Sequence, residues 1–168
     1  MLKKIVIFLL CAFPMLAIAQ DKFGHTNSEE LLMSMPEIAT IEKTMDELQT
    51  QWESEMLKMR EEYFAKIKEF QDKQATMPES IKNARQSEII ELEQRITTFQ
   101  QTASADLQNK QQELLTPVIE KVRKAINEVG AENNYTYIFD LAQRGIVYQS
   151  SKANDVTDLV KKKLSITK

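Results

Sequence analysis

The sequence is poor in cysteine, histidine, glycine and proline, and each scarcity narrows the range of functions. One cysteine and one histidine in 168 residues exclude a disulfide framework and a zinc site built from these two residue types. Three glycines and four prolines are too few for an all-β sandwich or for a glycine-rich phosphate-binding loop. A formal net charge of −3 disfavours a basic nucleic-acid-binding protein. The scarcity of glycine and proline favours a protein made of long helices.

The first residues have the pattern of a secretory signal peptide. Two lysines precede an apolar run over residues 5–19, which ends in a small-x-small pattern at Ala17 and Ala19. This run is shorter than the roughly 20 residues that a membrane-spanning helix needs, although an uncleaved anchor is the alternative. We predict export and cleavage after Ala19. Loss of residues 1–19 removes the only cysteine and changes the formal net charge from −3 to −5.

Two long amphipathic helices dominate the middle of the chain. Apolar residues recur at spacings of three and four from Ile38 to Phe70, and glutamate, lysine and glutamine occupy the other faces, as in a coiled coil. A second stripe runs from Ile81 to Val129 and is weak at Lys110. The pattern predicts an antiparallel helical hairpin. Legs of roughly 40 residues would extend about 60 Å, too long to form a globular core.

Short motifs predict where these helices begin and end. Asn27 or the serine after it is expected to cap a short first helix. Residues 34–37 (Ser-Met-Pro-Glu) and 76–79 (Thr-Met-Pro-Glu) both match the capping box, which predicts two further helix starts. Gly130 is expected to follow the end of the second long helix.

We divide the chain into a signal peptide (1–19), an arm (38–116) with its tip near 76–79, and two separate parts of a small body (20–37 and 117–168). Pro117 marks the boundary, where it should kink the helix because it lacks a backbone donor. A body of this size buries too little surface to be stable alone, so oligomerisation is predicted.

Strands and short helices are expected in the body. The N-terminal part should supply one strand at residues 22–27 and one short helix. Strand formers at 135–140 and 146–148 predict a C-terminal β-hairpin. A final helix is expected over 155–164, with three apolar side chains facing inward: Val156, Leu159 and Val160. The predicted fold class is therefore mainly α, with a coiled-coil hairpin projecting from a small strand-based core.

In the order of these parts the sequence resembles the Skp/OmpH family of periplasmic chaperones for outer-membrane proteins. The segment from Leu114 to Asp140 is the closest local match, with Pro117, Val118, Lys121, Val122 and Asn134-Tyr135-Thr136-Tyr137 in their places. The segment from Val147 to Asp158 also fits the polar turn into the last helix. The resemblance extends over essentially the whole mature chain.

The resemblance implies a homotrimer with a barrel-like body and three arms around a cavity. Unfolded precursors of outer-membrane β-barrels would be held there without ATP, in the periplasm. The best-known members are basic, whereas this mature chain is acidic. Contact with a membrane is therefore not supported by its charge, and no lipopolysaccharide-binding residues are assigned.

Four apolar residues are candidates for contact with such clients. Leu57 and Phe64 are seven residues apart and share a helix face outside the stripe, and Ile90 stands beside another isoleucine so that one of the two must point away. Met77 lies at the tip, and methionine adapts to varied partners. The alternative is that these are scattered surface residues without a role. The methionines at 45, 56 and 59 are expected to fill the seam.

No catalytic, cofactor-binding or metal-binding residues are predicted, and the protein is not expected to be an enzyme. His25 stands alone without a catalytic partner, and acidic pairs such as Glu61–Glu62 diverge on a helix. The alternative function is a structural or adaptor protein of the cell envelope. An adaptor would need an interlocking motif at the tip, and the short tip sequence at residues 76–79 favours a chaperone instead.

Overall fold

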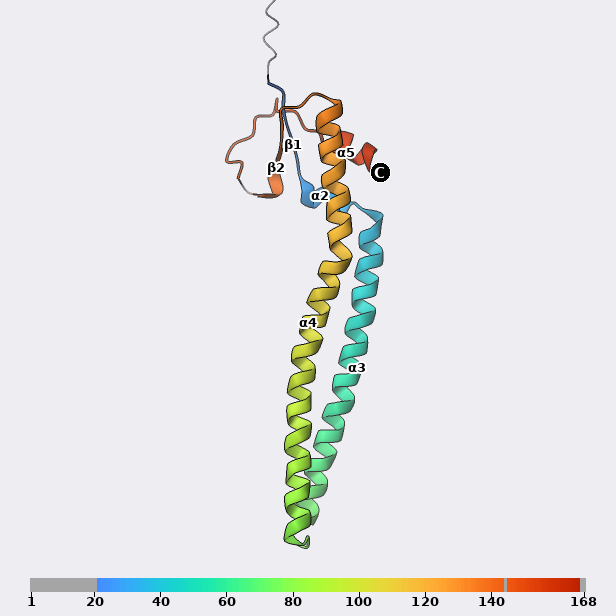
Figure 1. The fold of residues 1–168 in the computed structure, drawn as a ribbon, viewed down its shortest axis with the longest axis vertical. Helices are drawn as coiled ribbons and strands as arrows, with labels where there is room; N and C mark the ends of the chain where they lie inside the picture. Colours follow the sequence, from blue (N-terminus) through green and yellow to red (C-terminus); the bar gives the residue numbers. More distant parts are fainter. Residues whose placement is uncertain (1–20, 144, 167–168) are drawn as a thin grey trace, which may run out of the picture.

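A computed structural model describes residues 21–143 and 145–166 of the chain, and the predicted signal peptide lies outside the described residues. In order, the elements are β1 (Phe23–Thr26), α2 (Ser28–Met33), α3 (Pro36–Lys73), α4 (Glu79–Glu132), β2 (Tyr137–Asp140), the short 3-10 helix η1 (Leu141–Gln143) and α5 (Thr157–Lys163). Figure 1 shows α3 and α4 as a long arm that extends from a small body containing the other elements. The predicted fold class is confirmed.

The arm is a two-helix antiparallel pair held by a narrow seam. At about 1.5 Å per residue, α3 is about 57 Å long and α4 about 80 Å long. Buried seam positions include Ile41 and Met59 on α3 and Leu92 and Ala103 on α4, while most other side chains of the arm are exposed. The arm therefore has no interior beyond this seam. Met45 and Met56 are half-buried in it, in agreement with the prediction.

The two predicted capping boxes do not form. The residue before a proline is restricted to extended backbone, so Met35 (φ −72, ψ 132) takes the N-cap position of α3 and Pro36 the first helical position. Ser34 instead ends α2, and its hydroxyl donates to a carbonyl of that helix. The second box, at residues 76–79, fails likewise because Pro78 is the N-cap of α4 and makes no side-chain cap hydrogen bond.

The body is built around a two-stranded parallel sheet. β1 pairs with β2 in parallel, with Phe23 opposite Tyr137 and Thr26 opposite Asp140. On its other edge, β1 meets the segment before α5: the His25 amide donates to the Asn154 carbonyl at 2.9 Å. Three helices, α2, α3 and α4, lie between the two strands in sequence, and this long connection is what a parallel pair requires.

The predicted C-terminal β-hairpin is wrong. Within the described residues, 146–148 form no strand, and Val147 is 100% exposed. η1 follows β2 directly, and no strand that pairs with β2 follows η1 in the described residues. A segment rich in strand formers is thus left without a partner strand in the single chain.

The core of the body lies where α2, α5 and the base of α4 meet. Leu31, Val156 and Val160 are fully buried, and Val122 and Val129 of α4 pack against them. The Asn27 side chain caps α2 by accepting from the amides of Glu29 and Glu30, as predicted. Leu159, expected to face inward, is 41% exposed. It falls on the outer face of the short helix α5, one position before the buried Val160.

The C-terminal end of α4 also differs from the prediction. The helix continues through Gly130 to Glu132, and Asn134 takes the left-handed conformation with φ 56. Asparagine tolerates this region better than most residues. Gly130 is instead placed near Ile138 of β2, which an added Cβ would meet at 3.4 Å. Earlier in the same helix, Pro117 lies inside α4 without ending it.

Asp140 ties the end of β2 to the start of α2. Its carboxylate accepts from the Ser28 hydroxyl at 2.6 Å, the Ser28 amide at 3.0 Å and the Ala142 amide at 3.1 Å. Burial raises the pKa of Asp140, but these hydrogen bonds outweigh burial and hold the pKa below its ordinary value. The carboxylate is therefore a structural link between the two halves of the body.

Replacing Asp140 with alanine should destabilise the body by about 2 kcal/mol at neutral pH, since hydrogen bonds to a charged group are lost. A lowered folded-state pKa means that this stabilisation is present above the ordinary pKa of an aspartate, about 4, and is lost as the pH falls through the lowered value. Urea unfolding of both proteins at pH 7 and near pH 2 measures this. An equal difference at both pH values would contradict the assignment.

Candidate functional site

Large exposed apolar side chains gather in two places, along the arm and on the sheet of the body. On the arm, Leu57 is 58% exposed, Phe64 64% and Ile90 53%. In the body, Phe23, Tyr137 and Phe139 stand on the exposed side of the two strands. The three side chains of the sheet form one contiguous apolar surface, which marks a place of interaction. The three side chains of the arm are separate from one another, and the two sets are the candidate functional sites.

Leu57, Phe64 and Ile90 lie on one flank of the arm. Each follows directly after a half-buried seam residue (Met56, Tyr63 and Ile89). On each helix, the residue after a seam position lies about 100° further round the axis. The second helix runs in the opposite direction and faces the first, and these two reversals cancel. The residues after the seam positions of both helices therefore lie on the same side of the pair. We call this side the apolar flank. Its exposure agrees with the sequence prediction, and the role of its residues in binding stays a prediction.

The other side of the arm is polar. The residues one place before the seam positions are Gln51, Glu55, Lys58, Glu62, Lys66, Glu88, Glu91, Arg95, Thr98 and Thr102. Ion pairs cross this side, with the Lys66 ammonium 3.3 Å from the Glu88 carboxylate. The Arg85 guanidinium donates to the same carboxylate at 2.7 Å and, with Lys66, lowers its pKa. We call this side the polar flank, and its charges keep the arm hydrated.

Met77 is not part of the apolar flank. It is half-buried at the tip, where it lines a small cavity together with Phe70, Ile89 and the charged side chains of the polar flank. The structure therefore brings three of the four predicted residues to one side and leaves the fourth among ion pairs.

The apolar flank contains a hollow that the sequence analysis did not identify. It has a volume of about 710 Å³ and lies between α3 and α4. Its apolar lining is Trp52, Met56, Leu57, Phe99, Ala103 and Leu107, and its polar lining is Gln49, Glu53, Arg60, Gln100 and Ser104. The signal that could have revealed it is Ala103, a small residue at a seam position facing larger ones. Leu57, predicted from the sequence, lies at the edge of this hollow.

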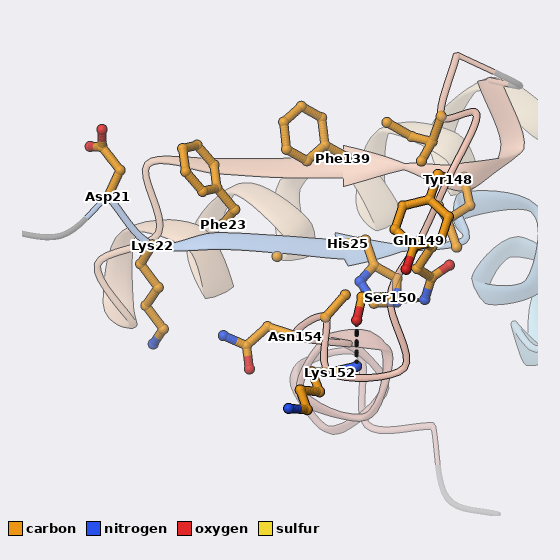
Figure 2. Close-up of a pocket in the computed structure, with 14 residues that line it drawn as sticks. Asp21, Lys22, Phe23, His25, Phe139, Tyr148, Gln149, Ser150, Lys152 and Asn154 are labelled. Atoms are coloured by element: carbon orange, nitrogen blue, oxygen red, sulfur yellow. Dashed lines mark hydrogen bonds between the residues drawn. The ribbon is translucent and has the colours of Figure 1, made fainter.

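The exposed face of the sheet carries an aromatic ladder. The rings of Phe23 and Tyr137 are stacked with centroids 6.0 Å apart, and Phe139 lies 6.1 Å from each of them. Figure 2 shows Phe23 and Phe139 on neighbouring strands, with Tyr148 and Gln149 of the following connection nearby. A pocket of about 650 Å³ is lined by Phe23, Phe139, Tyr148 and Gln149.

His25 lies buried beside this pocket. Its Nε2 atom is 2.7 Å from the Gln149 amide nitrogen and 4.0 Å from a carboxylate oxygen of Asp155. Asp155 also accepts from the Thr157 amide at 2.8 Å, and hydrogen bonding to Thr157 lowers its pKa while His25 adds to the effect. These contacts join β1 to the C-terminal connection. Within residues 21–143 and 145–166, no three histidine, cysteine or acidic side chains are placed to hold a metal ion.

Comparison with known proteins gives a family and a fold. The family described as Outer membrane protein (OmpH-like) matches residues 22–164. A crystal structure from Caulobacter crescentus CB15, described as a candidate outer membrane chaperone (OmpH-like), superposes with a TM-score of 0.73 at 16% identity. The match covers 86% of this chain and 83% of that one. No curated protein matches the sequence. Among residues 21–143 and 145–166, none of the helices combines the length and the apolar character that a membrane span requires.

Proposed function

The chain belongs to the Skp/OmpH family of OmpH-like outer membrane proteins, and we propose that it is an ATP-independent holdase chaperone of the periplasm. It would bind unfolded precursors of outer-membrane proteins between its helical arms and prevent their aggregation. Export would follow cleavage of the signal peptide after Ala19. The observation that carries the proposal is the apolar flank: three large apolar side chains, each more than half exposed, on an arm whose other exposed side chains are mostly polar.

A holdase needs many weak contacts rather than one tight site. Leu57, Phe64 and Ile90 are separated by polar side chains, so each offers a small apolar area to whatever sequence lies against it. Partial burial of one such side chain contributes about 1 kcal/mol. Several such contacts hold a client, yet each can be released separately. Such binding depends on apolar area and not on a particular sequence, as a chaperone requires.

A homotrimer assembled through the body is part of the proposal. The aromatic ladder and the unpaired segment at residues 146–148 would both be exposed in a monomer. Apolar surface of this kind, next to an open sheet edge, favours pairing with further copies of the chain. Three arms that leave one assembled body would then enclose a cavity, with the apolar flanks available to its interior.

Titration of the purified protein against a urea-unfolded β-barrel precursor during dilution tests the proposal. We expect suppression of light scattering that saturates at a fixed ratio, without ATP. Native mass spectrometry of the mixture should find three protein subunits for each bound precursor. Scattering that is unaffected by excess protein would reject the holdase, and binding only to folded partners would favour the adaptor function.

Salt distinguishes apolar contact from charge attraction. In about 1 M NaCl, where electrostatic screening acts over about 3 Å, long-range attraction between the charged arm and a client is removed. Because we assign the main contacts to the apolar flank, we expect the affinity for the precursor to change less than about threefold. Fluorescence anisotropy of a labelled precursor measures this, and release of the precursor at high salt would contradict the assignment.

A further inference from the structure

We propose that the hollow of the apolar flank is a binding subsite for one bulky apolar side chain of an extended client polypeptide. The inference rests on the proposed function and extends it, because it assigns a place on the arm and a pattern to the client. It is carried by the shape of the hollow, its lining, and an indole group without a hydrogen-bond partner.

The hollow exists because of a local mismatch in the seam. Trp52 and Phe99 fill one end, with ring centroids 5.1 Å apart. At the next seam position of α4 stands Ala103, whose single methyl group cannot fill the space between the helices. The space of about 710 Å³ is a groove open to solvent along the side of the seam, and not a void enclosed within it. It opens on the flank where Leu57 is exposed.

The lining suits a polypeptide and not a charged ligand. Apolar walls surround the space, and the polar side chains of the lining include one acid, Glu53, and one base, Arg60, so that the charges cancel. Gln49, Gln100 and Ser104 supply amide and hydroxyl groups that can pair with a main chain. An anion or nucleic acid would instead require a surplus of positive charge.

The Trp52 indole nitrogen is buried and has no hydrogen-bond partner. A buried donor without an acceptor raises the free energy of the arm. Trp52 lines the hollow, so the backbone of a chain that enters the hollow passes close to this ring. The free arm therefore retains an unmet hydrogen bond that a main-chain acceptor can satisfy.

The spacing between the hollow and the next exposed apolar residue of α3 indicates the sequence pattern of the bound client segment. Met56 lines the hollow and Phe64 lies eight residues further along α3, which is about 12 Å. An extended chain covers this distance in about four residues, and side chains an even number apart point to the same face. The client segment is therefore an extended chain of alternating apolar and polar residues.

The single tryptophan of the chain makes this testable, since Trp52 reports on the hollow directly. The probe is a tryptophan-free synthetic peptide of alternating valine and threonine with a nitroxide on its central apolar position. We expect saturable quenching of Trp52 fluorescence. Ala103→Leu fills the hollow and should weaken the apparent affinity about tenfold. Thr102→Leu adds the same side chain on the polar flank and should leave the affinity unchanged.

Circular dichroism shows whether Ala103→Leu keeps its helices. If it does not, Leu57→Ser replaces it, because this exposed edge residue can be changed without disturbing the seam, and it should weaken the peptide about threefold. Absence of quenching, or equal affinity in the wild type and the hollow variant, overturns the subsite. A Trp52 change that depends on protein concentration alone identifies a second copy as the occupant and also overturns it.

Suppression of precursor aggregation by the same preparation separates the two proposals. Suppression without Trp52 quenching would leave the holdase standing and reject the hollow. Saturable quenching without suppression would support the hollow as a peptide site and reject the holdase.

Discussion

Joint replacement of Leu57, Phe64 and Ile90 with serine should weaken binding of an unfolded precursor about 100-fold. The three side chains are 58%, 64% and 53% exposed, so they contribute little to the stability of the arm and are free to contact a client. Loss of about 1 kcal/mol of apolar contact at each position totals about 3 kcal/mol, or about two decades in affinity. Anisotropy of a labelled precursor gives the affinity.

The matched control replaces the same three residues with methionine. Methionine retains apolar area and flexibility, so this variant should bind within about threefold of the wild type. Both variants should keep the helical signal and the subunit number, because exposed substitutions change stability little. If the serine variant still prevented aggregation at wild-type concentrations, the apolar flank would not be the client-binding surface.

Gly24→Val should disrupt the body, with a loss of about 3 kcal/mol, at the upper end for overpacking of a core. Gly24 lies in β1, and a Cβ there would approach the Tyr135 ring at 2.9 Å and the Val156 side chain at 3.0 Å. Val156 is fully buried, and the Tyr135 ring packs against the core and has the Lys22 ammonium 4.0 Å from its centroid. Neither can move without disturbing the core.

Gly145 provides the matched control for this substitution. A Cβ at Gly145 would meet nothing within 4 Å, so Gly145→Val should change the stability little. Thermal unfolding followed by circular dichroism, with limited proteolysis near the C terminus, compares the two. Because the subunits are proposed to assemble through the body, Gly24→Val should also lower the subunit number in native mass spectrometry. Equal stability of the two variants would show that β1 is not packed as described.

The short motifs at the helix ends gave one correct prediction and three incorrect ones. The motifs at 34–37 and 76–79 both predict capping boxes, but the prolines place the helix starts elsewhere. Pro36 is the first residue of α3 and follows Met35 in extended backbone, whereas Pro78 is itself the N-cap of α4. Asn27, with no proline near its helix start, caps α2 as predicted. Gly130 was likewise expected to follow the end of α4. The helix instead continues to Glu132, and Asn134 takes the left-handed conformation after it.

The body was harder to predict than the arm. Strand formers at 135–140 and 146–148 suggested a hairpin, since neighbours in sequence often pair. The structure pairs β2 with the distant β1 instead and leaves residues 146–148 without a partner in one chain. Such a choice depends on which strand the fold brings near, and strand propensity carries no information about that.

The sequence alone determined the hairpin arm, its seam, the exposed residues Leu57, Phe64 and Ile90, and the likeness to the Skp/OmpH family. These follow from helical periodicity, which depends only on residues three and four apart. Only the tertiary structure decided the parallel pairing of β1 with β2, the separation of Met77 from the apolar flank, and the hollow beside Trp52. Each of these depends on how two distant segments align against each other, and that alignment is set by packing across the whole chain.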